Sequence, residues 1–127
     1  MEERVDAGGR EKPLREQPIL GIDRRGEAWV VRLGGELDLY NAPAVRETLR
    51  DVVVNEPERL VLDLAEVEFI DSTALGTLTE VRAGLPTRGA LLLAAPGIDV
   101  RRTLKVSGID RHLPVHDTVD AALAATL

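Results

Sequence analysis

Short aliphatic runs alternate with segments of helical period along most of this chain, and this alternation limits the folds open to it. Two strand-like runs flank a turn at residues 25–27. Each later aliphatic run is followed by a segment whose apolar residues share one helical face, as Ala74, Leu78 and Val81 do. The order β-β-α-β-α-β-α-β-α is typical of a mixed sheet with helices packed against it. We therefore predict an α/β domain that begins with a β-hairpin and continues as alternating strand and helix.

The expected strands and helices are bounded by residues that favour turns and helix ends. Strands are expected over residues 19–23, 28–33, 59–64, 90–94 and 113–115. Helices are expected to start at Asn41, at Ser72 or Thr73, at Pro96-Gly97 and at Asp117. Gly34-Gly35 should end the second strand, and Asn41 and Asp117 should act as N-caps.

Residues 1–17 differ in composition from the rest of the chain. They are rich in Glu, Arg, Asp, Lys and Gly, and Pro13 and Pro18 lie near their end. Such a segment has too few apolar side chains to offset the entropy lost on ordering. We expect a disordered charged tail over residues 1–17 and a single folded domain over residues 18–127.

Composition argues against several classes of function. The chain of 127 residues has 16 basic and 22 acidic side chains, and this net charge of -6 disfavours nucleic-acid binding. It has no cysteine, which removes disulfides, thiolate metal sites and cysteine nucleophiles. The charged start lacks the apolar core of a secretory signal, and the apolar run 90–95 is too short to span a bilayer. We expect a cytoplasmic protein that binds no nucleic acid, membrane, metal or cofactor.

The most distinctive stretch is residues 69–76, Phe-Ile-Asp-Ser-Thr-Ala-Leu-Gly. It lies between an aliphatic run and a helical segment, so Asp71, Ser72 and Thr73 stand at an expected helix N-terminus. One interpretation is a capping sequence, since these three residue types are preferred N-caps. The other is a modification site, where a hydroxyl accepts a phosphate. The stretch alone leaves both interpretations open.

A second motif follows the expected hairpin. Residues 35–38 read Gly-Glu-Leu-Asp, and a helix with an early Ala-Pro comes next. Loops at the carboxyl ends of the strands should meet at one edge of the sheet, which would bring Asp38 near Ser72. The two motifs together resemble the signatures of the STAS domain of bacterial anti-sigma factor antagonists. The resemblance covers about residues 18–127.

The resemblance implies a switch between partners. In that family, an anti-sigma factor with serine kinase activity phosphorylates the hydroxyl residue directly after the motif's aspartate, which is Ser72 here. The unphosphorylated antagonist binds the anti-sigma factor and releases the sigma factor, and a phosphatase resets the switch. Thr73 is a minor alternative acceptor. The implied partner-binding residues are Asp38, Asp71, Ser72, Thr73, Leu75 and Gly76.

An enzyme is the main competing hypothesis, and the residues argue against it. The nucleophile motif Gly-x-Ser-x-Gly is absent, because Ile70 and Ala74 occupy its glycine positions. Asp71 adjoins Ser72 in sequence, which is the wrong relation for an aspartate that orients a histidine base. No glycine-rich nucleotide loop is present either. We expect a binding module and not an enzyme; a STAS scaffold or regulatory module that does not act on a sigma factor is the alternative.

Several of these residues also have a purely structural interpretation. For Asp71, a helix cap and a partner contact are equally good interpretations. For Asp38, the alternative to a partner contact is a structural role in the turn. His112 and His116 are expected at the surface or at a sheet edge, without a catalytic or metal-binding role. Trp29 is expected to pack within the hairpin or at its edge.

Overall fold

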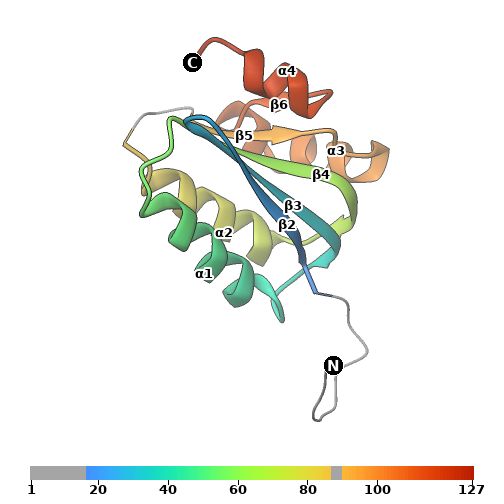
Figure 1. Cartoon of the computed structure of the whole chain (residues 1–127). Coiled ribbons are helices and arrows are strands. Elements are labelled where there is room, and N and C mark those ends of the chain that lie inside the picture. The colour runs from blue at the N-terminus through green and yellow to red at the C-terminus, as the bar shows by residue number, and fades with distance from the viewer. Residues whose placement is uncertain (1–16, 87–89) are drawn as a thin grey trace.

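A mixed five-stranded sheet is the centre of the computed structural model, which describes residues 17–86 and 90–127 (Figure 1). The strands are β2 (Ile19–Arg25), β3 (Ala28–Leu37), β4 (Arg59–Ile70), β5 (Leu91–Ala94) and β6 (Val115–His116), in that spatial order. β2 and β3 form an antiparallel hairpin, and the remaining neighbours pair in parallel. The predicted α/β class with an N-terminal hairpin is confirmed. The expected tail falls on residues 1–16, which lie outside the described residues, and on residue 17.

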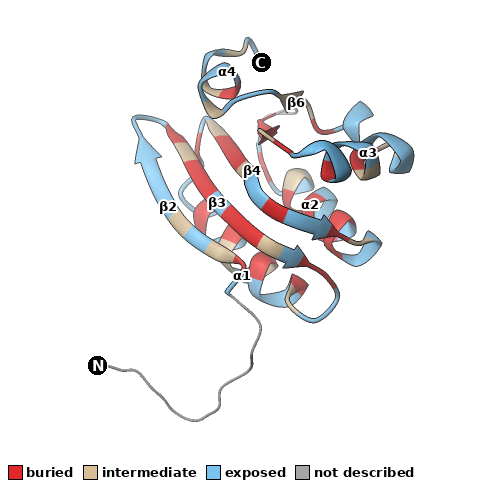
Figure 2. Cartoon of the chain, turned by 90° about the vertical axis from the view of Figure 1, so that its right-hand side faces the viewer, coloured by how far each residue is buried: buried red, intermediate tan, exposed pale blue. Residues whose placement is uncertain are grey.

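The helices divide unequally between the two faces of the sheet. They are α1 (Ala42–Val53), α2 (Ser72–Ala83), α3 (Ile98–Ser107), the short 3-10 helix η1 (Ile109–Arg111) and α4 (Val119–Ala124). α1, α2 and α3 contribute to the larger core on one face, and α4 packs on the other face. Figure 2 shows the strands between these layers, with β2 at the exposed edge. Within the described residues, no helix combines the length and apolar character needed to cross a bilayer.

Alternation along β4 explains how one strand serves both cores. Leu60, Leu62 and Leu64 face the larger cluster, whereas Val61 faces the smaller one beneath α4. Successive side chains of a strand point to opposite faces, so a central strand covered on both sides must be apolar at successive positions. This requirement accounts for the continuous aliphatic run from Leu60 to Leu62, whose side chains are fully buried.

The second strand does not end at Gly34-Gly35, as the sequence had suggested. β3 continues to Leu37, and its register against β4 shifts on both sides of the glycine pair. Gly35 has a φ of 73°, which favours glycine, and a Cβ at position 34 would lie 2.7 Å from Leu20 Cδ1. The two glycines therefore form a β-bulge with a close side-chain approach, instead of terminating the strand.

Other boundaries also differ from those expected. β4 runs to Ile70 instead of residue 64, because Glu66, Val67, Phe69 and Ile70 still pair with residues 34–37 of β3. The last strand is Val115–His116 instead of residues 113–115, since its parallel pairing with β5 begins only at Val115.

The cap of α4 is also corrected. Thr118 is the N-cap, and its side chain accepts a hydrogen bond from the Ala121 amide at 2.9 Å. Asp117, the expected cap, instead accepts a hydrogen bond from Arg101 of α3 at 2.9 Å. Asp117 thus lies one residue before the cap, and its carboxylate contacts α3 instead of the start of α4.

Candidate functional site

The two sequence motifs meet where β3 and β4 end side by side. Leu37, the last residue of β3, pairs with Ile70, the last residue of β4. The loop of residues 38–41 leaves one strand, and Asp71 leads from the other into α2. The Asp71 amide donates a hydrogen bond to the Leu37 carbonyl at 3.0 Å, which extends the pairing beyond the strands. Parallel strands thus bring the Asp38 segment against the start of α2, as expected.

Asp71 connects these two segments through its side chain. Oδ1 accepts a hydrogen bond from the Ala74 amide at 2.9 Å, which makes Asp71 the N-cap of α2. Oδ2 accepts a second hydrogen bond, from the Leu39 amide at 3.1 Å. One carboxylate therefore caps the helix and fixes the neighbouring loop at the same time. This geometry supports the structural interpretation of Asp71.

Asp38 and Asn41 shape the loop from within. Asp38 Oδ1 accepts hydrogen bonds from the amides of Tyr40 (3.0 Å) and Asn41 (3.3 Å). The Asn41 side chain bonds back to the same segment. Its Oδ1 accepts a hydrogen bond from the Asp38 amide at 2.9 Å, and its Nδ2 donates one to the Glu36 carbonyl at 2.7 Å. Asn41 occupies the N-cap position of α1, but its side chain makes no capping hydrogen bond there. Asp38 is only 9% exposed, so its carboxylate chiefly fixes the shape of this loop.

The loop presents two large side chains to solvent. Leu39 is 55% exposed and Tyr40 is 74% exposed. Side chains of this size and apolar character are costly to leave in water, and exposed patches of them commonly mark interaction sites. Sequence reasoning missed both residues, because neither the strand nor the helix period extends over a loop. The sequence signal that could have identified them is their position directly after the first motif, Gly-Glu-Leu-Asp.

Ser72 and Thr73 form the exposed first turn of α2. Because Asp71 fills the N-cap position, Ser72 is not the cap of this helix. Within the described residues, no hydrogen bond engages the side-chain hydroxyl of Ser72 or of Thr73. Ser72 therefore presents an unengaged hydroxyl on a fixed helical turn.

The outward face of α2 continues past Ser72 through Gly76. A Cβ built on Gly76 would meet no heavy atom within 4 Å, so the glycine is not required by packing inside the domain. Leu75 is 8% exposed and belongs to the core, although its edge lines a groove beside Ser72. Of the implied partner-binding residues on α2, Ser72, Thr73 and Gly76 are thus the exposed ones.

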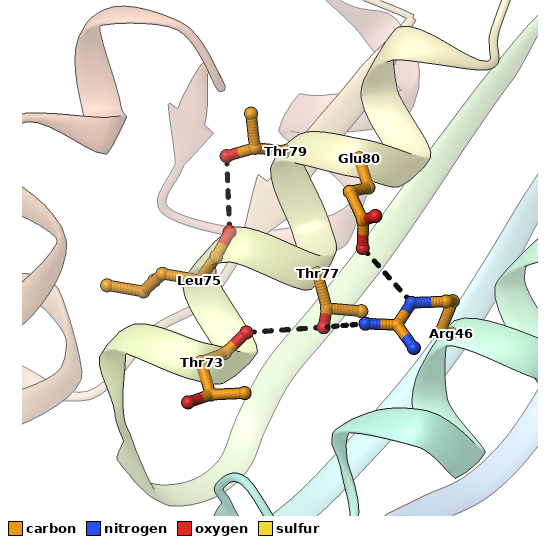
Figure 3. A network of polar contacts seen from close by, with 6 residues as sticks. All are labelled: Arg46, Thr73, Leu75, Thr77, Thr79 and Glu80. Carbon is orange, nitrogen blue, oxygen red and sulfur yellow. Dashed lines mark hydrogen bonds and ion pairs between the residues drawn. The ribbon is translucent and has the colours of Figure 1, made fainter.

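A side-chain network ties α2 to α1 (Figure 3). Arg46 donates from Nε to Glu80 Oε1 at 3.0 Å and from Nη2 to Thr77 Oγ1 at 3.5 Å. Thr77 in turn donates to the Thr73 carbonyl at 3.2 Å. Each exposed contact contributes little alone, about 0–1 kcal/mol for such an ion pair. Their joint effect is to hold the middle turns of α2 against the neighbouring helix.

The remaining candidate residues lie outside this cluster. His112 is exposed after η1, and His116 is half-buried in β6 at the sheet edge. Trp29 packs half-buried in the hairpin, with the Arg24 guanidinium 5.5 Å from its ring centroid. Over the described part of the chain, no group of three or more His, Asp or Glu side chains is arranged to hold a metal ion.

Comparison with known proteins agrees with this geometry. The sequence-family model of the STAS domain matches residues 21–122 of the chain. The chain belongs to the STAS domain family. It is 34% identical over 101 residues to the anti-sigma-F factor antagonist RsfB of Mycobacterium tuberculosis, covering 80% of this chain and 82% of RsfB.

Solved structures show the same STAS fold. An anti-sigma factor antagonist from Mycobacterium paratuberculosis superimposes with a TM-score of 0.76 at 32% identity, covering 83% of this chain and 89% of that one. The phosphorylated form of the Bacillus cell fate determinant SpoIIAA gives 0.60 at 20% identity, covering 81% and 95%, which supports the fold alone. RsfB and the Mycobacterium paratuberculosis protein are both named as anti-sigma factor antagonists, which agrees with the expectation of a regulatory binding module.

Replacing Asp71 tests the link between the two motifs. Asp71→Ala removes both hydrogen bonds and should lower the free energy of unfolding by about 2 kcal/mol. Asp71→Asn keeps one acceptor oxygen and should lose about half as much. Urea denaturation measures both, and amide hydrogen exchange should accelerate at Leu39 and Ala74. Ser72→Ala is the matched control and should stay within about 0.5 kcal/mol of wild type. An Asp71→Ala variant as stable as wild type would contradict this role.

Proposed function

We propose that this protein is an anti-sigma factor antagonist controlled by phosphorylation of Ser72. Its unphosphorylated form binds an anti-sigma factor with serine kinase activity, and this binding releases the sigma factor. Phosphorylation ends the binding, and a phosphatase restores it. The observation that carries the proposal is the exposed, unengaged hydroxyl of Ser72, held on a fixed helical turn directly after Asp71. The switch lies within residues 18–127, which we assign to the STAS domain, and residues 1–17 take no part in it.

The proposed partner surface combines an apolar loop with the outward face of α2. Leu39 and Tyr40 supply exposed apolar area, and Ser72, Thr73 and Gly76 supply a flat helical surface. Such a surface, apolar at one side and free of bulky side chains at the other, suits close contact with a complementary protein. Asp38 and Asp71 serve it chiefly by fixing the loop, and Leu75 by anchoring α2 in the core.

Electrostatics explains how phosphate would end binding without unfolding the domain. A phosphoserine adds about -1.5 to -2 charge at neutral pH. A helix N-terminus favours nearby negative charge by about 0.3–1 kcal/mol at an exposed site, so the domain tolerates the group. In the complex, however, the dianion must lose water close to the carboxylate of Asp71. Like charges brought together in this way cost several kcal/mol.

The first experiment maps the site of modification. Incubation with the cognate kinase and ATP should place phosphate on Ser72 in the wild type and in Thr73→Ala, because the acceptor directly follows the aspartate. Mass spectrometry of the digested protein locates the group. Phosphate found chiefly on Thr73, together with continued labelling of Ser72→Ala, would refute the assignment.

A charge-mimicking variant separates binding from folding. Ser72→Asp should keep its circular dichroism spectrum and melt within a few degrees of wild type, because the charge lies at a helix start. Its affinity for the anti-sigma factor should fall at least about tenfold, or roughly 1.4 kcal/mol. Ser72→Ala should bind as wild type does. Loss of the helical signal would mean that the switch acts through folding, and unchanged affinity would favour a scaffold whose binding ignores Ser72.

Added bulk on α2 tests where the partner docks. Gly76→Leu places a large side chain on the outward face, where a Cβ meets no neighbour. The domain should be at least as stable as wild type, since leucine is the better helix former. Binding to the anti-sigma factor should weaken at least tenfold in a calorimetric titration. Ala44→Leu adds similar bulk to an exposed position of α1 and should leave binding unchanged. Equal affinities of the two variants would place the partner elsewhere.

A further inference from the structure

Two adjoining grooves open beside Ser72, between α2 and the segment formed by α3 and η1. One is lined by Ser72, Leu75, Arg102, Thr103, Val106 and Ser107. The other is lined by Ser72, Leu75, Gly76 and Thr79 of α2 and by residues 107–109, 111 and 112. Ser72, Leu75 and Ser107 belong to both grooves, so the hydroxyl of Ser72 lies where they join.

The wall opposite α2 carries basic side chains. Arg102 lines the first groove, and Arg111 and His112 line the second. Among the described residues that line either groove, none is acidic. The positive charge that faces Ser72 is therefore not neutralised within the grooves.

Both arginines are also unengaged, unlike others in the domain. Within the described residues, no hydrogen bond or ion pair holds the guanidinium of Arg102 or Arg111. By contrast, Arg46 pairs with Glu80 at 3.0 Å, and Arg101 pairs with Asp117 at 2.9 Å. Two guanidinium groups thus remain available for an anion in the grooves.

The local charge contrasts with that of the whole chain. Residues 98–112 contain four basic side chains (Arg101, Arg102, Lys105 and Arg111) and two acidic ones (Asp99 and Asp110), a net of +2. The full chain carries -6. An anion on this side of the domain is therefore attracted locally, even though the protein as a whole repels it.

We propose that Arg102 and Arg111 hold the phosphate group of phosphorylated Ser72 across these grooves. This inference rests on the proposed function, because it takes Ser72 as the modified residue. The planar guanidinium presents several N–H donors whose geometry matches phosphate oxygens, and a phosphoserine has three strong acceptor oxygens. One arginine approaches from each groove, so the phosphate is bound between them.

Such a contact adds a second reason for loss of binding. The phosphate and the two arginine side chains would fill the grooves between α2 and α3. A partner that uses the face around Gly76 would then meet occupied grooves as well as a new charge. The phosphorylated state is in this way stabilised inside the domain itself.

The test uses protein with phosphoserine installed at position 72 during translation, so that no kinase is required. A phosphorus NMR titration measures the second pKa of the phosphate, which is ordinarily about 6. Nearby cations favour the dianion and lower this pKa. The pKa should therefore be at least about 0.5 unit higher in the double variant Arg102→Gln/Arg111→Gln than in the parent protein, with the single variants in between.

Controls account for the other charges near the phosphate. Arg50→Gln removes an exposed arginine of α1, which is also unengaged among the described residues, and should leave the pKa unchanged. Asp71 adjoins the phosphate in every variant, so its effect cancels. His112 also lines the second groove, so the comparison is repeated in a His112→Gln background. Circular dichroism verifies the fold, and the single variants replace the double variant if it unfolds.

A phosphate pKa that is the same with and without the two arginines would overturn the proposal. If the unphosphorylated double variant then also binds the anti-sigma factor more weakly, the arginines would instead be assigned to contact with an acidic surface of the partner. Failure of the proposed function would appear separately, in the kinase and affinity experiments, which this titration does not use.

Discussion

The arrangement of the site depends on the two hydrogen bonds that the carboxylate of Asp71 accepts. The carboxylate accepts one hydrogen bond from the first turn of α2 and another from the loop that follows β3. The parallel pairing of β3 and β4 brings these two backbones together, and the carboxylate then fixes their spacing. Asp38 and Asn41 complete the loop from the other side. Residues far apart in sequence therefore form one surface of defined shape.

Much of the fold follows from local patterns, and the differences arise where tertiary contacts decide. Helical spacing correctly identified three of the five buried residues of α2, Ala74, Leu78 and Val81. Gly34-Gly35 looked like a strand end, yet pairing with β4 carries β3 through it as a bulge. Asp117 and Thr118 are both good caps in isolation. In the folded chain Thr118 is the cap, and Asp117 pairs with Arg101, which lies on a different helix.

The candidate site, like the fold, could be predicted from the sequence only in part. Strand order alone indicated that the Asp38 loop and the start of α2 would meet at one edge. It did not indicate that Asp71, and not Ser72, would fill the cap, because both residue types suit that position. The grooves that contain Arg102 and Arg111 could not be predicted either. They exist only because α3 and η1 lie beside α2 in the folded chain.

The two attachments of α2 have a consequence for timing. Asp71 fixes the start of the helix, and Arg46 holds its middle turns to α1. These contacts hold the helix at both places, and the proposed switch requires no movement of it when Ser72 gains or loses a charge. Under the proposed switch, no slow rearrangement would delay the response. The fraction of active molecules would then follow the balance of the modifying enzymes directly, and the domain would keep no record of its previous state.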